Sequence, residues 1–92
     1  MLLPTRMAVL NHLDKVGTAN LNEVMESLQP LYGSEKQFNK DLYLDHLMAL
    51  EANGYLHLKD YSLGEDDELV LSFEITEDGQ QAVGKYVPQD YR

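Results

Sequence analysis

Residues 50–56 read Leu50-Glu51-Ala52-Asn53-Gly54-Tyr55-Leu56, and residues 75–79 read Ile75-Thr76-Glu77-Asp78-Gly79. Gly54 suits the left-handed turn that ends a helix, and Thr76 suits the N-cap position that begins one. Between these two motifs, residues 55–61 and 69–75 alternate apolar and polar side chains, as expected of an antiparallel pair with one buried face. The stretch therefore predicts a helix that leads into a two-stranded hairpin and then into a second helix.

Three helical patterns precede the hairpin. The first is expected over residues 4–16. The second should begin at an N-cap, Asn20, with Glu23 completing a capping box, and should end at Pro30, followed by a turn over residues 29–33.

The third helix is expected to start near Ser34 or shortly after it, with Ser34 as a candidate N-cap, and to end at Asn53. One apolar stripe with helical spacing should face the core, formed by Phe38, Tyr43, Leu47 and Leu50. A closing helix is expected over residues 77–86, and residues 87–92 are expected to form a short flexible tail.

Length and composition indicate one small globular domain over residues 1–92. The chain is 43% hydrophobic, has no cysteine and carries a formal net charge of −9. The lack of cysteine excludes disulfides and thiolate sites and fits a reducing, cytoplasmic setting. The start of the chain does not have the pattern of a signal peptide, and no apolar run reaches the length of a membrane span.

The negative charge is concentrated in the hairpin region. Residues 60–78 hold eight of the sixteen acidic residues and no lysine or arginine, and residues 65–68 are four consecutive carboxylates. A surface of this sign repels polyanions and attracts basic partners. The alternative to a binding role is that residues 65–68 form a solvated loop that keeps the edge of the hairpin soluble.

Catalytic and metal-binding patterns are not apparent. The three histidines fall on three different predicted elements, no nucleophile motif or glycine-rich phosphate loop is present, and the acidic run does not have the spacing of a calcium-binding loop. We therefore expect no enzyme activity, no metal and no cofactor, and infer no small-molecule ligand.

The order of elements, with the motifs Leu-Glu-x-x-Gly-Tyr-Leu at residues 50–56 and Thr-Glu-x-Gly at residues 76–79, resembles the MarR/PadR type of winged-helix regulators. The resemblance covers nearly the whole chain and implies an α+β fold with a three-helix core, a β-hairpin wing and a C-terminal helix. It also implies that the third helix would enter the DNA major groove while the wing touches the flanking backbone.

Carried onto this sequence, the resemblance gives DNA-contacting candidates in the third helix, namely Lys36, Asn39, Lys40 and Tyr43. The sequence departs from the pattern at Asp45, where a residue that contacts bases or phosphate is expected, and at the apolar pair Leu44 and Met48. Because lysine and arginine supply most of the affinity for DNA, the acidic wing opposes this role.

The same departures suggest contact with a protein. The candidate residues are Leu44, Asp45 and Met48 on the third helix together with the wing acids Glu65, Asp66, Asp67 and Glu68. The alternative is that Leu44 and Met48 belong to the core, in which case Tyr43, Leu47 and Leu50 could not all be buried.

Two functions follow from the sequence. The first is a non-enzymatic regulatory module that acts through protein contacts, self-association as a homodimer included, with Tyr86 and Tyr91 as candidates for the dimer contact. The second is a DNA-binding transcriptional regulator.

Overall fold

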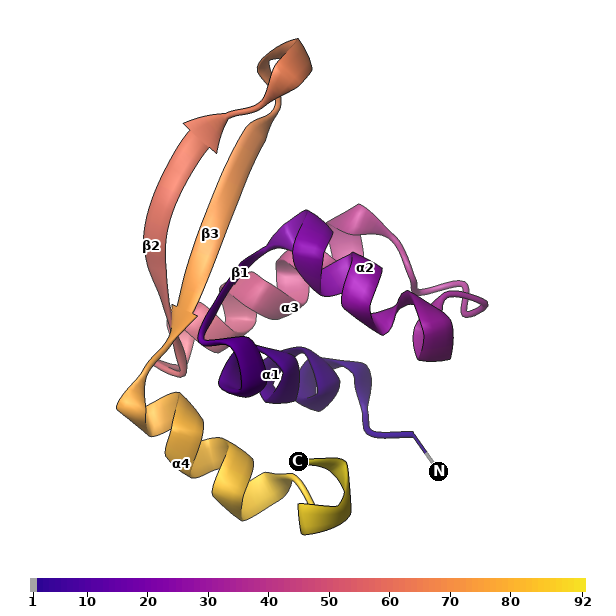
Figure 1. Ribbon diagram of the computed structural model, residues 1–92, viewed down its shortest axis with the longest axis vertical. Helices are drawn as coiled ribbons and strands as arrows, with labels where there is room; N and C mark the ends of the chain where they lie inside the picture. Colours follow the sequence, from indigo (N-terminus) through magenta and orange to yellow (C-terminus); the bar gives the residue numbers. More distant parts are fainter. Residues whose placement is uncertain (1) are drawn as a thin grey trace.

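Strand β3 (Leu69–Ile75) is the central strand of a three-stranded antiparallel sheet in the computed structural model, which describes residues 2–92 (Figure 1). On one side β3 pairs with β2 (Leu56–Leu63), and on the other with the short β1 (Thr18–Asn20). The β2–β3 hairpin projects beyond the helices, and its tip is the end furthest from α4 (Figure 1).

Four α-helices complete this α+β domain. They are α1 (Thr5–Val16), α2 (Leu21–Tyr32), α3 (Lys40–Ala52) and α4 (Glu77–Tyr86), and two short 3₁₀ turns cover Glu65–Asp67 and Gln89–Tyr91. Helices α1, α2 and α3 gather on one side of the hairpin, and α4 lies beyond its base (Figure 1). None of the helices within residues 2–92 combines the length and apolarity of a membrane span.

The core lies where α1, α3 and α4 meet the base of the sheet. It contains the three residues of the predicted stripe, Tyr43, Leu47 and Leu50, all of them buried. Phe38, the fourth, packs against the core from the preceding loop, with its ring centroid 5.1 Å from that of Tyr43. Phe73 on β3 is fully buried and faces Ala19 on one neighbour and Leu58 on the other.

Helix α2 does not end at Pro30, as the sequence suggested, but continues to Tyr32. Proline removes one backbone hydrogen bond from the helix and normally costs about 3 kcal/mol in a helix interior. Here the last turn is held by Tyr32, which is buried and donates its hydroxyl proton to the carbonyl of Leu3 at 2.7 Å. Tertiary contact therefore outweighs the local helix-breaking signal.

Helix α3 begins at Lys40 rather than near Ser34, so the predicted start was wrong. The actual N-cap is Asn39, whose side chain accepts a hydrogen bond from the backbone N–H of Leu42 at 3.0 Å. Residues 33–39 form successive turns, in which the N–H of Phe38 bonds to the carbonyl of Glu35. The predicted capping box of α2 is confirmed, since Asn20 and Glu23 exchange both hydrogen bonds.

The strands also differ from expectation at two places. Strand β1 was not predicted, and β2 reaches Leu63 instead of Tyr61. A register shift between Leu58 and Asp60 inserts Lys59 as an extra residue on β2. As a result Tyr61 and Leu63, which face Leu71 and Leu69, continue the apolar face of the hairpin towards its tip.

The C-terminal segment, expected to be a free tail, lies against the domain. Val87 is buried, and the side-chain N–H of Asn11 on α1 donates to the carbonyl of Tyr91 at 2.8 Å. The segment therefore adds to the packing around α1 and α4.

Gly79 and Gly84 in α4 should respond in opposite ways to alanine. A Cβ on Gly79 would lie 2.1 Å from the carbonyl oxygen of Tyr55, whereas the nearest atom to one on Gly84 is the Arg92 guanidinium at 4.0 Å. We expect Gly79→Ala to lower the free energy of unfolding by about 1–3 kcal/mol through overpacking. Gly84→Ala should raise it by up to about 1 kcal/mol through helix propensity. Urea denaturation of both variants measures the difference, and equal effects would contradict this packing.

The start of α3 can be tested with two polar-to-alanine changes. Asn39→Ala removes the cap and should lower the free energy of unfolding by about 1 kcal/mol. Ser34→Ala, five residues earlier and exposed, should change it by less than about 0.5 kcal/mol. Thermal denaturation monitored by circular dichroism compares the two, and a larger loss for Ser34→Ala would place the helix start there instead.

Candidate functional site

A groove separates the upper half of the hairpin from the N-terminal ends of α2 and α3. We call it the hairpin groove; it has a volume of about 170 Å³ and is lined by Leu21 and Asn22 of α2, Leu44 of α3 and residues 68–71 of the hairpin. The groove exists because β1 stops at Asn20, where the chain turns into α2, while β3 continues up to Leu69. Its lining is mainly aliphatic, which favours an apolar occupant.

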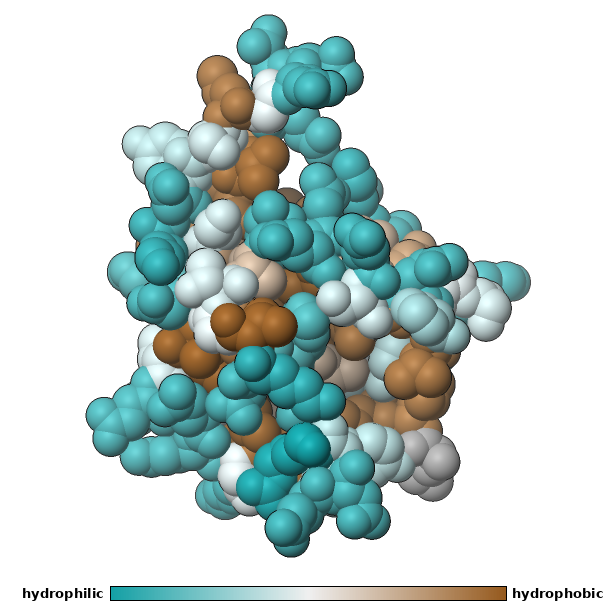
Figure 2. Space-filling model, in the orientation of Figure 1, coloured by the Kyte–Doolittle hydropathy of each residue, from teal (hydrophilic) through white to brown (hydrophobic). Residues whose placement is uncertain are grey.

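The hairpin face that continues from this groove is also apolar and largely uncovered. Leu63 and Leu69 are opposite each other on β2 and β3 and are 68% and 56% exposed. Tyr61, two pairs closer to the base, is exposed as well. Apolar surface is visible along the hairpin directly below the hydrophilic tip (Figure 2), and apolar surface that is rimmed by polar groups is typical of interaction sites.

The hairpin tip, residues 64–68, places the acidic run at the outer end of this surface. All five residues are exposed, and the two central ones, Asp66 and Asp67, have positive φ angles of 62° and 58°. Aspartate tolerates this left-handed conformation better than most residues. The tip therefore displays four carboxylates in water, next to an apolar surface.

One of these carboxylates reaches α3. The Lys40 ammonium lies 3.1 Å from Oε1 of Glu68, and both side chains are about half exposed. An exposed pair of this kind adds little to stability. Its consequence is electrostatic, because the basic group at the start of α3 is neutralised by the hairpin.

The structure leaves the four DNA-contacting candidates poorly placed for that task. Tyr43 is only 1% exposed, and burial raises the pKa of its hydroxyl to about 12, so it cannot reach a base. Asn39 uses its side chain to cap α3, and Lys40 is paired with Glu68. Lys36 is exposed but lies in the loop before α3.

Two of the protein-contact candidates, Leu44 and Glu68, lie together in the hairpin groove. Leu44 lies in the hairpin groove beside Glu68, and Met48, one turn further along α3, is 44% exposed. Asp45 is exposed on the same helix. Neither Leu44 nor Met48 is a core residue, so the alternative raised by the sequence is wrong for the part of the chain that the structure describes.

Sequence reasoning missed the contributions of Leu21, Leu69 and Leu71 to this surface. The two strand residues were assigned only to a buried face. A signal was available: the apolar stripe of residues 69–75 runs along the whole strand up to the acidic run, further than a core at the base of the hairpin can cover.

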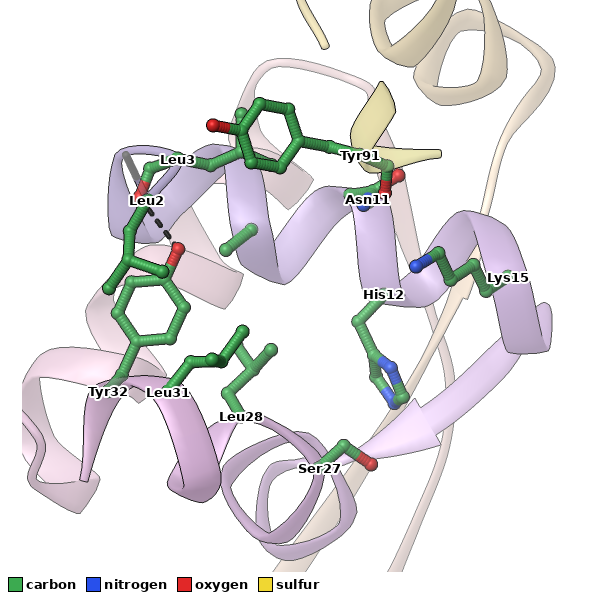
Figure 3. A pocket seen from close by; sticks show the side chains of 11 residues that line it. Leu2, Leu3, Asn11, His12, Lys15, Ser27, Leu28, Leu31, Tyr32 and Tyr91 are labelled. Carbon is green, nitrogen blue, oxygen red and sulfur yellow. Dashed lines mark hydrogen bonds between the residues drawn. The ribbon is translucent and has the colours of Figure 1, made fainter. Parts of the chain in front are cut away.

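A second cavity, of about 220 Å³, lies between α1, the end of α2 and the C-terminal segment (Figure 3). Leucines dominate its wall, and Tyr32 closes one side through its hydrogen bond to Leu3 (Figure 3). The side-chain oxygen of Asn11 is buried and has no hydrogen-bond partner among residues 2–92. This cavity marks where the C-terminal segment packs, and its lining has neither a cysteine nor an acidic group.

The surroundings of two histidines lower their pKa values and so favour the uncharged imidazole. Burial lowers the pKa of His46 on α3, and the nearby Arg6 lowers it further against the opposing effect of Asp45. The Arg6 Nε–H donates to Nδ1 of His46 at 3.2 Å, which requires an unprotonated nitrogen there. Burial likewise lowers the pKa of His12, with a further contribution from Lys15. Across residues 2–92, no three acidic, histidine or cysteine side chains are grouped as metal ligands.

Tyr86 and Tyr91, the candidates for a dimer contact, differ in exposure. Tyr86 is 52% exposed on α4, with the Lys85 ammonium 5.2 Å from the centre of its ring, whereas Tyr91 is partly buried and lines the second cavity. Of these two tyrosines, Tyr86 is therefore the more accessible to another molecule.

Comparison of the chain with protein-family models, with curated proteins and with solved structures gives no significant match. The functional argument consequently rests on the geometry of this chain alone.

The state of His46 is directly measurable. NMR titration should give it a pKa below 6.5, and Arg6→Met should raise that value, because one of its causes is removed. Since the folded pKa is lowered, the contribution of neutral His46 to stability is complete above the unfolded pKa and is lost as the pH falls through the folded value. An unchanged pKa in Arg6→Met would contradict the Arg6 contact.

Proposed function

We propose that this chain is a non-enzymatic regulatory module of the winged-helix type that acts by binding protein, with the hairpin groove and the adjoining apolar hairpin face as its contact surface. The observation that carries the proposal is the uncovered apolar surface formed by Leu44, Leu63 and Leu69, next to the carboxylates of the hairpin tip. A surface with an apolar centre and a polar rim is the usual anatomy of a protein interface.

The arrangement of α3 and the hairpin also supports the winged-helix assignment. Helix α3 leads into β2 through Gly54, which has a φ of 82°, and β3 leads into α4 through the Thr76 cap. In such a fold α3 and the wing together form the surface that meets a partner. The same two elements enclose the hairpin groove here.

Charge argues that this partner is not DNA. The tip acids and Asp41 and Asp45 on α3 are all exposed, and the salt bridge between α3 and the hairpin pairs Lys40 with Glu68. Close approach of phosphate would have to break that pair and bring like charges together. DNA binding through Lys36 and Lys40 remains the alternative function that the test below must distinguish.

A photo-crosslinking amino acid at Leu63 should form an adduct with protein in the source cells, because this side chain lies exposed on the proposed surface. The same amino acid at Gln80, which is exposed on α4, is the matched control and should not give that adduct. Leu44→Glu should abolish the Leu63 adduct while the domain stays folded, since Leu44 is at the groove and not in the core. An adduct with the mass of two copies would identify self-association as the contact.

Two results would contradict the protein-binding proposal. If a mixed-sequence DNA duplex at about 20 mM salt, where electrostatic attraction is strongest, shifts the NMR signals of residues 36–49, and Lys40→Ala weakens that binding, the chain binds DNA and the proposal is wrong. Absence of any protein adduct at Leu63 would also overturn it.

A further inference from the structure

The edge of β3 next to the hairpin groove has no strand beside it. Strand β2 pairs with β3 over its whole length, from Leu69 to Ile75, but β1 pairs only with Ser72, Phe73 and Glu74. Residues 69–71 therefore have a neighbouring strand on one side only. These three consecutive residues, whose side chains alternate between the two faces, all line the groove, so the groove runs along the edge of the strand.

The direction of the backbone groups follows from the hydrogen bonds of the flanking residues. The carbonyl of Glu68 accepts from the N–H of Gly64, and the N–H of Thr76 donates to the carbonyl of Tyr55. The backbone N–H and C=O groups of even-numbered residues of β3 therefore point towards β2. The N–H of Ile75 donates to the carbonyl of Gly17, so those of odd-numbered residues point to the opposite side. Backbone groups alternate along an antiparallel strand. The N–H and C=O of Leu69 therefore point towards the groove.

The side chains around this edge suit an apolar residue of an incoming strand. Leu44 and Leu21 form the wall opposite β3, and Leu69 and Leu71 project from β3 itself. At about 170 Å³ the groove has room for one or two aliphatic side chains. An added strand alternates its side chains, so every second residue could enter the groove.

Charge determines what the remaining residues of such a strand should be. The strand would pass Glu68, which lines the groove, and would approach the exposed tip carboxylates Glu65, Asp66 and Asp67 at one end. Another copy of this chain carries a net charge of −9 and would be repelled there. A basic segment would be attracted and could replace Lys40 as the partner of Glu68.

We propose that the hairpin groove receives an extended, lysine- or arginine-bearing segment of a partner protein, which adds to the sheet beside residues 69–71 as a continuation of β1. This mode of recognition takes affinity from main-chain hydrogen bonds and specificity from the alternate side chains. The inference rests on the proposed protein-binding function and specifies the chemistry of the partner.

The test uses the full isotope-labelled chain and three capped heptapeptides as probes. The first alternates lysine with valine, the second alternates glutamate with valine, and the third is the lysine peptide with its valine nitrogens methylated, which removes donors needed for strand pairing. We expect the first to shift the amide signals of Leu69, Leu71 and Leu44, with an affinity that falls steeply with salt. The other two should bind at least about tenfold more weakly.

Two matched variants localise the binding. Leu44→Arg places a positive charge and a longer side chain in the groove and should weaken the lysine peptide at least about tenfold. Gln80→Arg makes the same change of charge on the exposed surface of α4, outside the groove lining, and should leave the affinity within about twofold. The dispersion of the NMR spectrum verifies that both variants are folded.

Several results would overturn the inference. They are equal binding of the methylated peptide, equal binding of the glutamate peptide, amide shifts away from residues 69–71, or equal losses in the two arginine variants. The methylated peptide probes the unmodified chain, so the inference stays falsifiable even if Leu44→Arg does not fold. If the Leu63 adduct forms with a protein but the lysine peptide does not bind, only this inference fails and the protein-binding function stands.

Discussion

The short pairing of Thr18–Asn20 with Ser72–Glu74 is the contact on which the rest of the structure depends. It fixes the base of the hairpin to the helices, and it places Phe73 between Ala19 and Leu58 in the centre of the core. The pairing cannot extend further, because Asn20 is both the last residue of β1 and the N-cap of α2. The same residue therefore anchors the hairpin and leaves the upper edge of β3 open.

That open edge gives the molecule two different ends. At the base, the sheet is covered by α1, α3 and α4, and Leu56 and Phe73 are buried in the core. Towards the tip, Leu63 and Leu69 remain exposed although they continue the same face. Exposed apolar strands invite association. Under the protein-binding function proposed above, the four carboxylates at the tip would favour partners that carry positive charge.

The pair between Lys40 and Glu68 shows why net charge alone was an incomplete guide. Its energy is small because both groups are exposed. It nevertheless ties the cation at the start of α3 to one of the hairpin carboxylates. The charge of Lys40, which would otherwise serve contact with phosphate, is cancelled within the chain, and a basic partner could compete for Glu68.

Local signals in the sequence were sufficient for the elements whose stability is local. The Asn20 capping box, the Thr76 cap, the antiparallel hairpin and the stripe of Tyr43, Leu47 and Leu50 were all predicted and are all present. Each depends on residues within a few positions of one another, so spacing alone identifies it. The α+β class and the acidic character of the hairpin tip likewise followed from sequence.

Only the tertiary structure decided the features that join distant segments. Strand β1 exists because it pairs with residues more than fifty positions away, and α2 passes Pro30 because Tyr32 bonds to Leu3. Helix α3 is capped by Asn39 although Ser34 offers an equally good cap. The hairpin groove is of the same kind, since it brings together residues of α2, α3 and β3. Sequence periodicity indicates which face of a helix or strand is apolar. Which part of that face stays exposed to solvent depends on how far the neighbouring helices and strands extend along it.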